Sequence, residues 1–367
     1  MFDRRLLEDF DWILLLTVIT ISIIGFISIY SASASYGTET PYFQRQIIWF
    51  FIGLVTMAVV TMIDYRFLEK LSPLLHLLMI VLLVVVLIYG TGGPGSPVKR
   101  WIKIGPIFFQ PSELVKYTLV LYLAYYFNES RRVGNLGVKE LIWPLVVTLV
   151  PFALILKQPN YGTASLLIFT FIPVIFLVGI RLKTVFYTAI LGFISVPFGW
   201  LFFLKQYHRD RFLIFFNPEL DPLGKGYQII QSKISVGSGQ FWGKGYLKGT
   251  QARLNFLPAR HTDFIFSVYT EEWGFFGGVV LVGLYLFLIL WCLRHVGQTK
   301  DRSGTILTLG ITSILAFQIT INIAMVLGLL PIIGMPLPFM SYGGSALLSQ
   351  MIGIGLILNV RMRRYDI

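Results

Sequence analysis

Charged residues and cysteines are scarce in this chain of 367 residues. Only 13% of the residues are charged, and the single cysteine is Cys292. A soluble domain typically carries about 25% charged residues, so the composition excludes an ordinary soluble enzyme. One cysteine cannot form an intrachain disulfide, and the sequence has no C-x-x-C pair that would indicate a thiolate metal site.

Hydrophobic residues are correspondingly abundant, at 56%, and the mean hydropathy is +0.74. This excludes a disordered chain. The sequence contains no repeat of 20–50 residues and no low-complexity tract, which excludes solenoids and propellers. The formal net charge is nevertheless +12, because 30 Lys and Arg residues stand against 18 Asp and Glu residues. So few charges with so large an excess must be unevenly distributed.

Apolar segments long enough to cross a membrane, which takes roughly 20 residues, recur along the chain. They are 11–31, 45–63, 74–90, 111–128, 141–157, 162–180, 184–204, 264–293, 304–330 and 338–360. The first ends in small residues that imitate a signal-peptidase site, but its apolar core is longer than a usual signal peptide's, so we interpret it as an uncleaved span. We predict an all-α integral membrane protein, a single domain over 1–367 with about ten transmembrane helices.

Positive residues predict the orientation, because cytoplasmic loops carry the excess of Lys and Arg. If both termini are cytoplasmic, fifteen basic residues lie in inner segments and five in short outer loops. The sequence therefore predicts a multi-pass membrane protein with both termini on the cytoplasmic side. A large extracytoplasmic loop, 205–263, then lies between the seventh and eighth helices.

This loop carries nine basic and four acidic residues, a net charge of +5. Its stretch 227–234 has the pattern of an amphipathic helix lying at the membrane interface. Two interpretations remain open. The loop is either a basic surface attracted to anionic headgroups, or a site where Lys and Arg bind the phosphate of a phosphorylated lipid. Nucleic acid is not expected as a partner, because this face is outside the cell.

Acidic residues gather where the loop meets the eighth span. Asp263 stands at the membrane edge, where partial desolvation makes a carboxylate a better base. The alternative is that Asp263 caps the helix that follows. Glu271 lies inside the span, where ionisable groups are costly and usually functional. Its alternative role is an ion pair with a basic residue on another helix.

Two further polar clusters lie in or beside spans. Glu113 and Lys116 are spaced i, i+3 on one helix face, so they either form a buried pair or direct Lys116 at a pyrophosphate. The second cluster is Asn322 with the segment 330–345, whose prolines and glycines cannot all be helical. Irregular backbone at membrane depth must be buried in protein or line a cavity, so we expect this segment to shape a polar cavity.

Four motifs across these clusters resemble the SEDS family of bacterial shape, elongation, division and sporulation proteins. They are Gly-Thr-Gln at 249–251, His-Thr-Asp-Phe-Ile-Phe at 261–266, Glu-Glu-Trp-Gly at 271–274 and Pro-Leu-Pro-Phe-Met-Ser-Tyr-Gly-Gly-Ser at 336–345. Segments 101–116 and 158–163 support the resemblance, which covers nearly the whole chain. The first and third motifs are more similar to the elongation branch of the family than to the division branch.

The resemblance implies a peptidoglycan glycosyltransferase that polymerises lipid II at the outer leaflet of a bacterial cytoplasmic (inner) membrane. Asp263 is then the catalytic residue, as general base. Candidates for binding substrate or pyrophosphate are Lys116, Glu113, Arg100, Lys103, Arg211, Lys233, Arg253, Arg260, His261, Glu271 and Ser341. Under the resemblance, either Lys and Arg near the cavity or a divalent cation, Mg or Mn, stabilises the departing pyrophosphate, and no organic cofactor is expected. The implied partners are a class B penicillin-binding protein and other membrane proteins of the elongation machinery.

The residues leave two other functions open, a lipid II flippase and a non-catalytic scaffold for the transpeptidase. An O-antigen ligase or polymerase shares the basic external loop but lacks these motifs.

Overall fold

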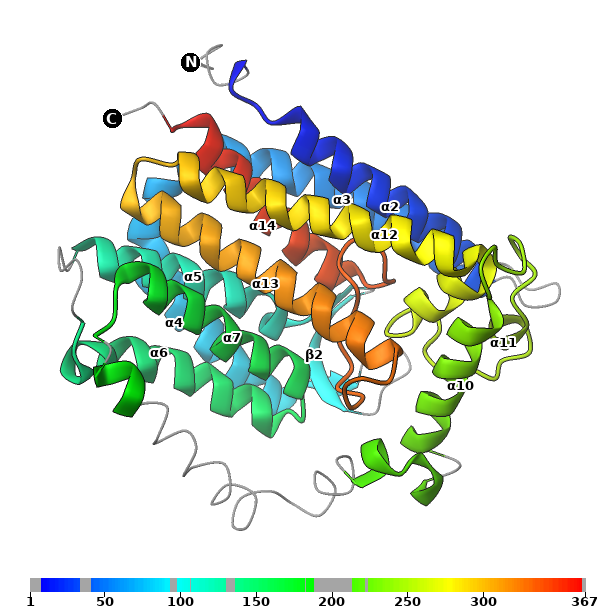
Figure 1. The fold of residues 1–367 in the computed structure, drawn as a ribbon. Coiled ribbons are helices and arrows are strands. Elements are labelled where there is room, and N and C mark those ends of the chain that lie inside the picture. The colour runs from blue at the N-terminus through cyan, green and yellow to red at the C-terminus, as the bar shows by residue number, and fades with distance from the viewer. Residues whose placement is uncertain are drawn as a thin grey trace.

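The computed structural model describes residues 8–33, 41–92, 98–105, 107–129, 136–181, 183–187, 213–221 and 224–364. This part of the chain is predominantly helical (Figure 1). The long helices are α2 (Trp12–Ser33), α3 (Pro41–Met62), α4 (Tyr65–Tyr89), α5 (Pro111–Glu129), α6 (Val138–Lys157), α7 (Tyr161–Val178), α12 (Ile265–Gln298), α13 (Arg302–Val326) and α14 (Gly344–Met362). Shorter ones are the 3₁₀ turn η2 (Pro218–Leu220), α10 (Lys225–Ser238) and α11 (Thr250–Arg253).

Among the described residues, 8 helices are long and apolar enough to cross a membrane: all the long ones except α5. The chain is therefore a multi-pass membrane protein, as predicted. The figure of about ten helices stays a prediction, because the seventh expected span, 184–204, lies outside the described residues beyond position 187.

Helix α5 is enclosed by other helices rather than by lipid. It packs against α4, α6, α7, α13 and α14. Val115, Lys116 and Leu119 are fully buried on it. Because protein surrounds α5, it can carry charged and polar residues that a lipid-facing helix could not. Helix α3 differs, since it exposes Phe51 and Val55, one turn apart, on a stripe suited to lipid tails.

The all-α prediction is wrong in one detail, a small antiparallel sheet between α4 and α5. Its strands are β1 (Thr91–Gly92), β2 (Lys99–Ile104) and β3 (Ile107–Phe109), in the order β1-β2-β3. Gly105, with a φ of +60°, allows the tight reversal after β2. Lys103 pairs with Phe108 across the hairpin, and its Nζ lies 5.9 Å from the Phe108 ring centroid.

The start of α2 and the end of α14 lie at one end of the bundle, and α10 and α11 lie at the opposite end (Figure 1). An ion pair of 2.8 Å between Arg364 and Asp9 joins the two described termini. The expected helix at 227–234 is confirmed within α10. The position of the large loop between a seventh and an eighth helix, and the side of the membrane on which each end lies, remain predictions.

Short polar side chains cap the first turns of several helices, and hydroxyl groups inside the helices hydrogen-bond to the helix backbone. Asp64 accepts a hydrogen bond from the backbone of Arg66 at the start of α4, and Asp301 accepts one from Gly304 at the start of α13. These are the acceptors that the unpaired amides of a helix N-terminus require. Hydroxyls inside the spans, such as that of Thr170, donate to the carbonyl four residues earlier and need no other partner.

Candidate functional site

The turn that carries Asp263 ends directly before α12. The N-cap residue of α12 is Phe264, so the alternative role of Asp263 as the N-cap is wrong by one position. Asp263 is half-buried, as expected for an acid at the membrane edge. Its carboxylate lies close to Gly334, because a Cβ on that glycine would stand 3.4 Å from Asp263 Oδ2. Gly334 also has a φ of +69°, which a side chain would strain.

Buried side chains hold the backbone of this turn from two directions. The Asn322 amide on α13 donates to the Asp263 carbonyl at 3.0 Å. The Ser341 hydroxyl donates to the Thr262 carbonyl at 2.7 Å and accepts the amide of Leu337 at 2.7 Å. The structure thus brings two of the sequence-predicted residues, Asp263 and Ser341, to one place. Ser341 reaches the site through the backbone of the turn.

The second half of the irregular segment 327–343 between α13 and α14 is buried in protein, whereas Leu327, Leu329 and Leu330 near its start are exposed. The polar cavity that this segment was expected to shape stays a prediction. Leu337, Phe339 and Met340 are fully buried. Side chains of four helices hydrogen-bond to its backbone. Gln318 Nε2 donates to the Pro336 carbonyl at 3.0 Å, and Tyr285 OH donates to the Pro338 carbonyl at 2.6 Å. Gln46 Nε2 donates to the Ser341 carbonyl at 3.1 Å, and Gln350 Oε1 accepts the Phe339 amide at 2.9 Å. Sequence reasoning missed these residues. A polar side chain inside an apolar span, three of the four being Gln, is the sequence feature that could have identified them.

Glu113 and Lys116 form a buried ion pair on α5. Their Oε2 and Nζ atoms are 2.7 Å apart, and the side chains are 7% and 0% exposed. Ser349 donates to the same Glu113 oxygen at 3.3 Å, and Gln318 Oε1 accepts from Lys116 at 3.5 Å. Both charged groups thus have partners within the protein. Because Gln318 also binds the irregular segment, Lys116 is linked to the segment that lies beside Asp263.

The basic candidates of the sheet differ from each other in exposure. Lys103 is exposed on β2. Arg100 is half-buried and donates through Nε to the Gln158 carbonyl at 3.1 Å and through a terminal nitrogen to the Pro159 carbonyl at 2.5 Å. Arg100 therefore fastens the sheet to the connection between α6 and α7.

Arg260 and His261 pack the turn against α2 and α3. Arg260 Nε donates to the Ala32 carbonyl at 2.5 Å, and burial lowers the pKa of this guanidinium. The His261 ring stacks on Tyr42 with centroids 4.4 Å apart. Burial lowers the pKa of His261, and the neighbouring Arg260 cation lowers it further. The structure therefore favours a neutral imidazole two residues before Asp263.

The remaining basic candidates lie on or near the loop helices. Lys233 is exposed on α10, and its stem lies over Gly328 in the turn after α13. Arg253 is exposed on α11 and donates to the Leu247 carbonyl at 3.4 Å. Arg211 lies outside the described residues.

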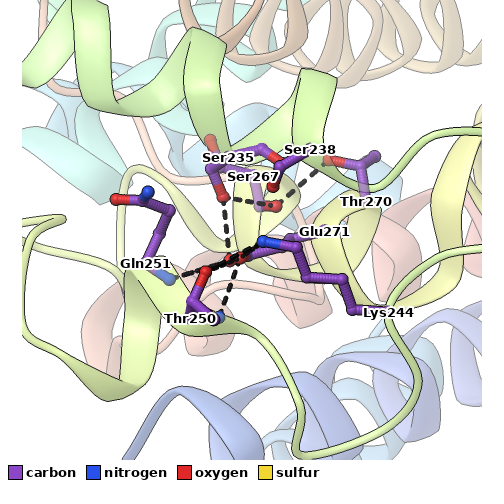
Figure 2. Close-up of polar contacts among 8 residues, drawn as sticks. All are labelled: Ser235, Ser238, Lys244, Thr250, Gln251, Ser267, Thr270 and Glu271. Carbon is purple, nitrogen blue, oxygen red and sulfur yellow. Dashed lines mark hydrogen bonds and ion pairs between the residues drawn. The ribbon is translucent and has the colours of Figure 1, made fainter.

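Glu271 is fully buried and is the centre of a polar network between α12 and the loop (Figure 2). Lys244 Nζ lies 2.6 Å from Glu271 Oε1, and the Thr250 amide and hydroxyl donate to the same oxygen at 2.8 and 2.9 Å. The Gln251 amide donates at 3.2 Å, and the Ser235 hydroxyl reaches Oε2 at 3.3 Å. The expected ion pair exists, but its partner is a loop lysine rather than a residue on another helix.

The loop also docks onto a break in α12 at Gly274, where φ is 68° and ψ is −166°. The amides of Lys244 and Gly245 donate to the carbonyls of Glu271 and Glu272, each at 3.0 Å. Beyond the break, the amides of Phe275 and Phe276 donate to the carbonyls of Gln240 and Phe241, at 2.8 and 3.1 Å. The motifs at 249–251 and 271–274 therefore form one structural unit, which fixes the loop to the first part of α12, the helix that follows Asp263.

A divalent cation held by the protein alone needs a cluster of ligands. No group of three or more His, Cys, Asp or Glu side chains in the described ranges is arranged to hold a metal ion. A Mg ion that is held mainly by substrate phosphates needs only one or two carboxylates, so the divalent cation stays a prediction.

Known proteins of one family are similar to this chain. The family model described as "Cell cycle protein", for FtsW, RodA and SpoVE, matches residues 11–366. The peptidoglycan glycosyltransferase MrdB of Escherichia coli (strain K12) is 38% identical over 354 residues, covering 96% of this chain and 94% of that protein.

Solved structures agree over nearly the whole length. A chain of a peptidoglycan synthase complex has a TM-score of 0.84 and 32% identity, covering 98% of this chain and 99% of that one. The crystal structure of Thermus thermophilus rod shape determining protein RodA has a TM-score of 0.72 and 29% identity, covering 97% and 98%. This chain therefore belongs to the cell cycle protein family of FtsW, RodA and SpoVE.

Proposed function

We propose that this chain polymerises lipid II into β-1,4-linked glycan strands at the outer face of the bacterial cytoplasmic membrane, with Asp263 as general base. The chain is an enzyme of the peptidoglycan glycosyltransferase type, as its relatives in the family are. The proposal concerns the substrate, the side of the membrane and the residues that act. One observation carries it: the Asp263 carboxylate lies beside Gly334 while buried side chains hold its backbone.

The reaction requires a general base positioned beside the acceptor hydroxyl and groups that stabilise the leaving pyrophosphate. The 4-hydroxyl oxygen of an acceptor sugar attacks C1 of the donor, and Asp263 takes the hydroxyl proton. A new C1–O bond forms as the bond between C1 and the pyrophosphate oxygen breaks. Undecaprenyl pyrophosphate leaves with the bonding electrons. Direct displacement inverts an α-linked donor to a β-linked product, and Asp263 then returns the proton to water.

Basic side chains are proposed to stabilise the departing pyrophosphate. Lys103 and Lys233 are exposed and available to a large anion, and Arg260 flanks the turn that carries Asp263. Lys116 is fully buried and paired in this structure, so its contact with pyrophosphate requires the Glu113 pair to open. Lys116 is therefore proposed to act only when the substrate replaces Glu113 as its anionic partner.

The partner is proposed to be a class B penicillin-binding protein, whose transpeptidase crosslinks the strand that this chain makes. The similar chain of the solved peptidoglycan synthase complex belongs to an assembly that coordinates polymerization and crosslinking, which supports such a pairing. Other membrane proteins of the elongation machinery are proposed as further partners. The excess of basic residues in the inner segments supports cytoplasmic termini.

Replacing Asp263 with Asn tests the base directly, because the amide keeps the shape but cannot take a proton. We expect Asp263→Asn to abolish polymerisation of lipid II in proteoliposomes that contain the penicillin-binding partner. Membrane insertion and binding of the partner should be unchanged. Glu219→Gln, an exposed acid of η2, is the matched control and should keep wild-type activity.

Retained glycan synthesis by Asp263→Asn would remove Asp263 as the base and favour the scaffold. A wild-type protein that makes no glycan but moves lipid II across the bilayer would favour the flippase.

A further inference from the structure

Asn322, on α13, takes no direct part in the proposed reaction. We propose that it is a positioning residue, which fixes the backbone of Asp263 against the segment that follows α13. The proposal rests on the proposed function of Asp263 as general base. Asn322 does not touch the reacting atoms; it acts through Asp263, which does.

The Asn322 amide joins two parts of the chain at one point. Its Nδ2 donates to the carbonyl of Asp263 at 3.0 Å and to the carbonyl of Met335 at 2.5 Å. Met335 follows Gly334, the residue that lies beside the Asp263 carboxylate. One NH₂ group therefore holds both the residue that carries the base and the backbone that its carboxylate faces.

The contacts define the orientation of this amide. Turning it over would point Oδ1 at two carbonyl oxygens, which repel it. In the present orientation Oδ1 is buried, with no hydrogen-bond partner among the described residues, and the whole side chain is fully buried. A buried polar atom without a partner is costly, and an apolar residue would avoid that cost. The two hydrogen bonds donated by Nδ2 explain why an amide stands there.

Gln318 extends the same arrangement by one helical turn. Residues i and i+4 share a helix face, and Gln318 binds Pro336, the residue after Met335. Gln318 also accepts from Lys116. One face of α13 thus connects the proposed base and the buried lysine through adjacent carbonyls of the irregular segment. Loss of Asn322 should release the Asp263 end of this connection.

The test compares Asn322→Leu and Asn322→Asp with Asp263→Asn in the polymerisation assay with the penicillin-binding partner. Leu has no donor. Asp keeps the shape of Asn but has at most one O–H to donate, so it cannot bind both carbonyls. A displacement of about 1 Å at a reacting group can cost about 10²-fold in rate, so we expect kcat to fall by about that factor. The KM for lipid II should change by less than about threefold, because binding groups are untouched.

Thr312→Val is the matched control on α13. Thr312 is also buried, and its hydroxyl donates within its own helix, to the Thr308 carbonyl at 2.7 Å. We expect Thr312→Val to keep wild-type kcat and KM. Thermal unfolding and co-purification of the partner would show which variants are folded.

A fall in kcat alone, in a folded variant, supports the positioning role. Wild-type kcat in folded variants, a rise in KM instead of a fall in kcat, or loss of folding in both variants would each overturn it. If Asp263→Asn is active, the proposed base fails independently of Asn322. If Asp263→Asn is inactive and both Asn322 variants are fully active, only the present inference fails.

Discussion

Two buried carboxylates have lysine partners at nearly the same distance, but their surroundings differ. Glu271 and Lys244 are 2.6 Å apart, and Glu113 and Lys116 are 2.7 Å apart. Glu271 also accepts backbone amides of α11 and a hydroxyl of α10, so it joins segments that are distant in the sequence. Lys244 is 28% exposed, so water screens part of its charge.

The Glu113–Lys116 pair is internal to one helix, and its lysine is fully buried. Its other partners are the side chains of Ser349 and Gln318, not loop backbone. An ion pair in the interior must repay the desolvation of both charges, and an apolar pair of similar size is often as stable. The comparison indicates that Glu271 is required to assemble the loop. It indicates equally that folding alone does not require charges at positions 113 and 116.

Removal of the Glu271 carboxylate should have the largest effect on stability. Glu271→Ala leaves the Lys244 ammonium and the amides of Thr250 and Gln251 without their acceptor. Because hydrogen bonds to a charged group contribute about 1.5–3 kcal/mol each, the loss should be about 3–5 kcal/mol. The unfolding temperature of the purified protein should fall accordingly. Glu271→Gln, which keeps an acceptor oxygen, should lose less. A Glu271→Ala protein with wild-type unfolding temperature would show that the loop does not depend on this residue.

The Lys116 pair should respond differently, because the loss can be reversed by a second neutral residue. Lys116→Met leaves the buried Glu113 carboxylate without its cation and should cost about 3 kcal/mol, the low end of the range for breaking a buried ion pair. Adding Glu113→Gln removes the stranded charge and should restore most of the unfolding temperature. Polymerisation should stay low in the double variant if Lys116 acts on pyrophosphate. Recovery of polymerisation together with stability would assign the pair to structure alone.

Much of the helical fold could be predicted from apolar segments, with errors where polarity and helicity disagree. The expected span 74–90 is the second half of α4, whose first turns carry Arg66, Glu69 and Lys70 and so fail an apolar criterion. The expected span 338–360 includes residues before Gly344 that are apolar but irregular and buried. Apolarity predicts burial in lipid or protein, and it does not by itself predict helix.

Of the site, sequence reasoning could identify residues but not their partners. A polar residue in an apolar span indicates a buried contact without naming it. Glu271 and Ser341 were expected to face substrate, whereas their polar atoms contact Thr250 and the backbone of Thr262. Asn322 contacts Asp263 across 59 positions of sequence, a separation that no local pattern encodes. The sheet was missed because its strands are short and lie between two spans.

Lys244 should be the least sensitive member of the two pairs. Lys244→Met leaves Glu271 with the amide and hydroxyl donors that already surround it, so its charge stays compensated. We expect a loss of about 1 kcal/mol, within the range for a partly exposed ion pair, and polymerisation close to wild type. The unfolding temperature tests the expected loss of stability, and an assay of glycan synthesis tests the expected activity. A loss as large as that of Glu271→Ala would mean that the ion pair, rather than the backbone amides, holds the loop on α12. In that case the two pairs would differ only in position, and both would depend on their lysines.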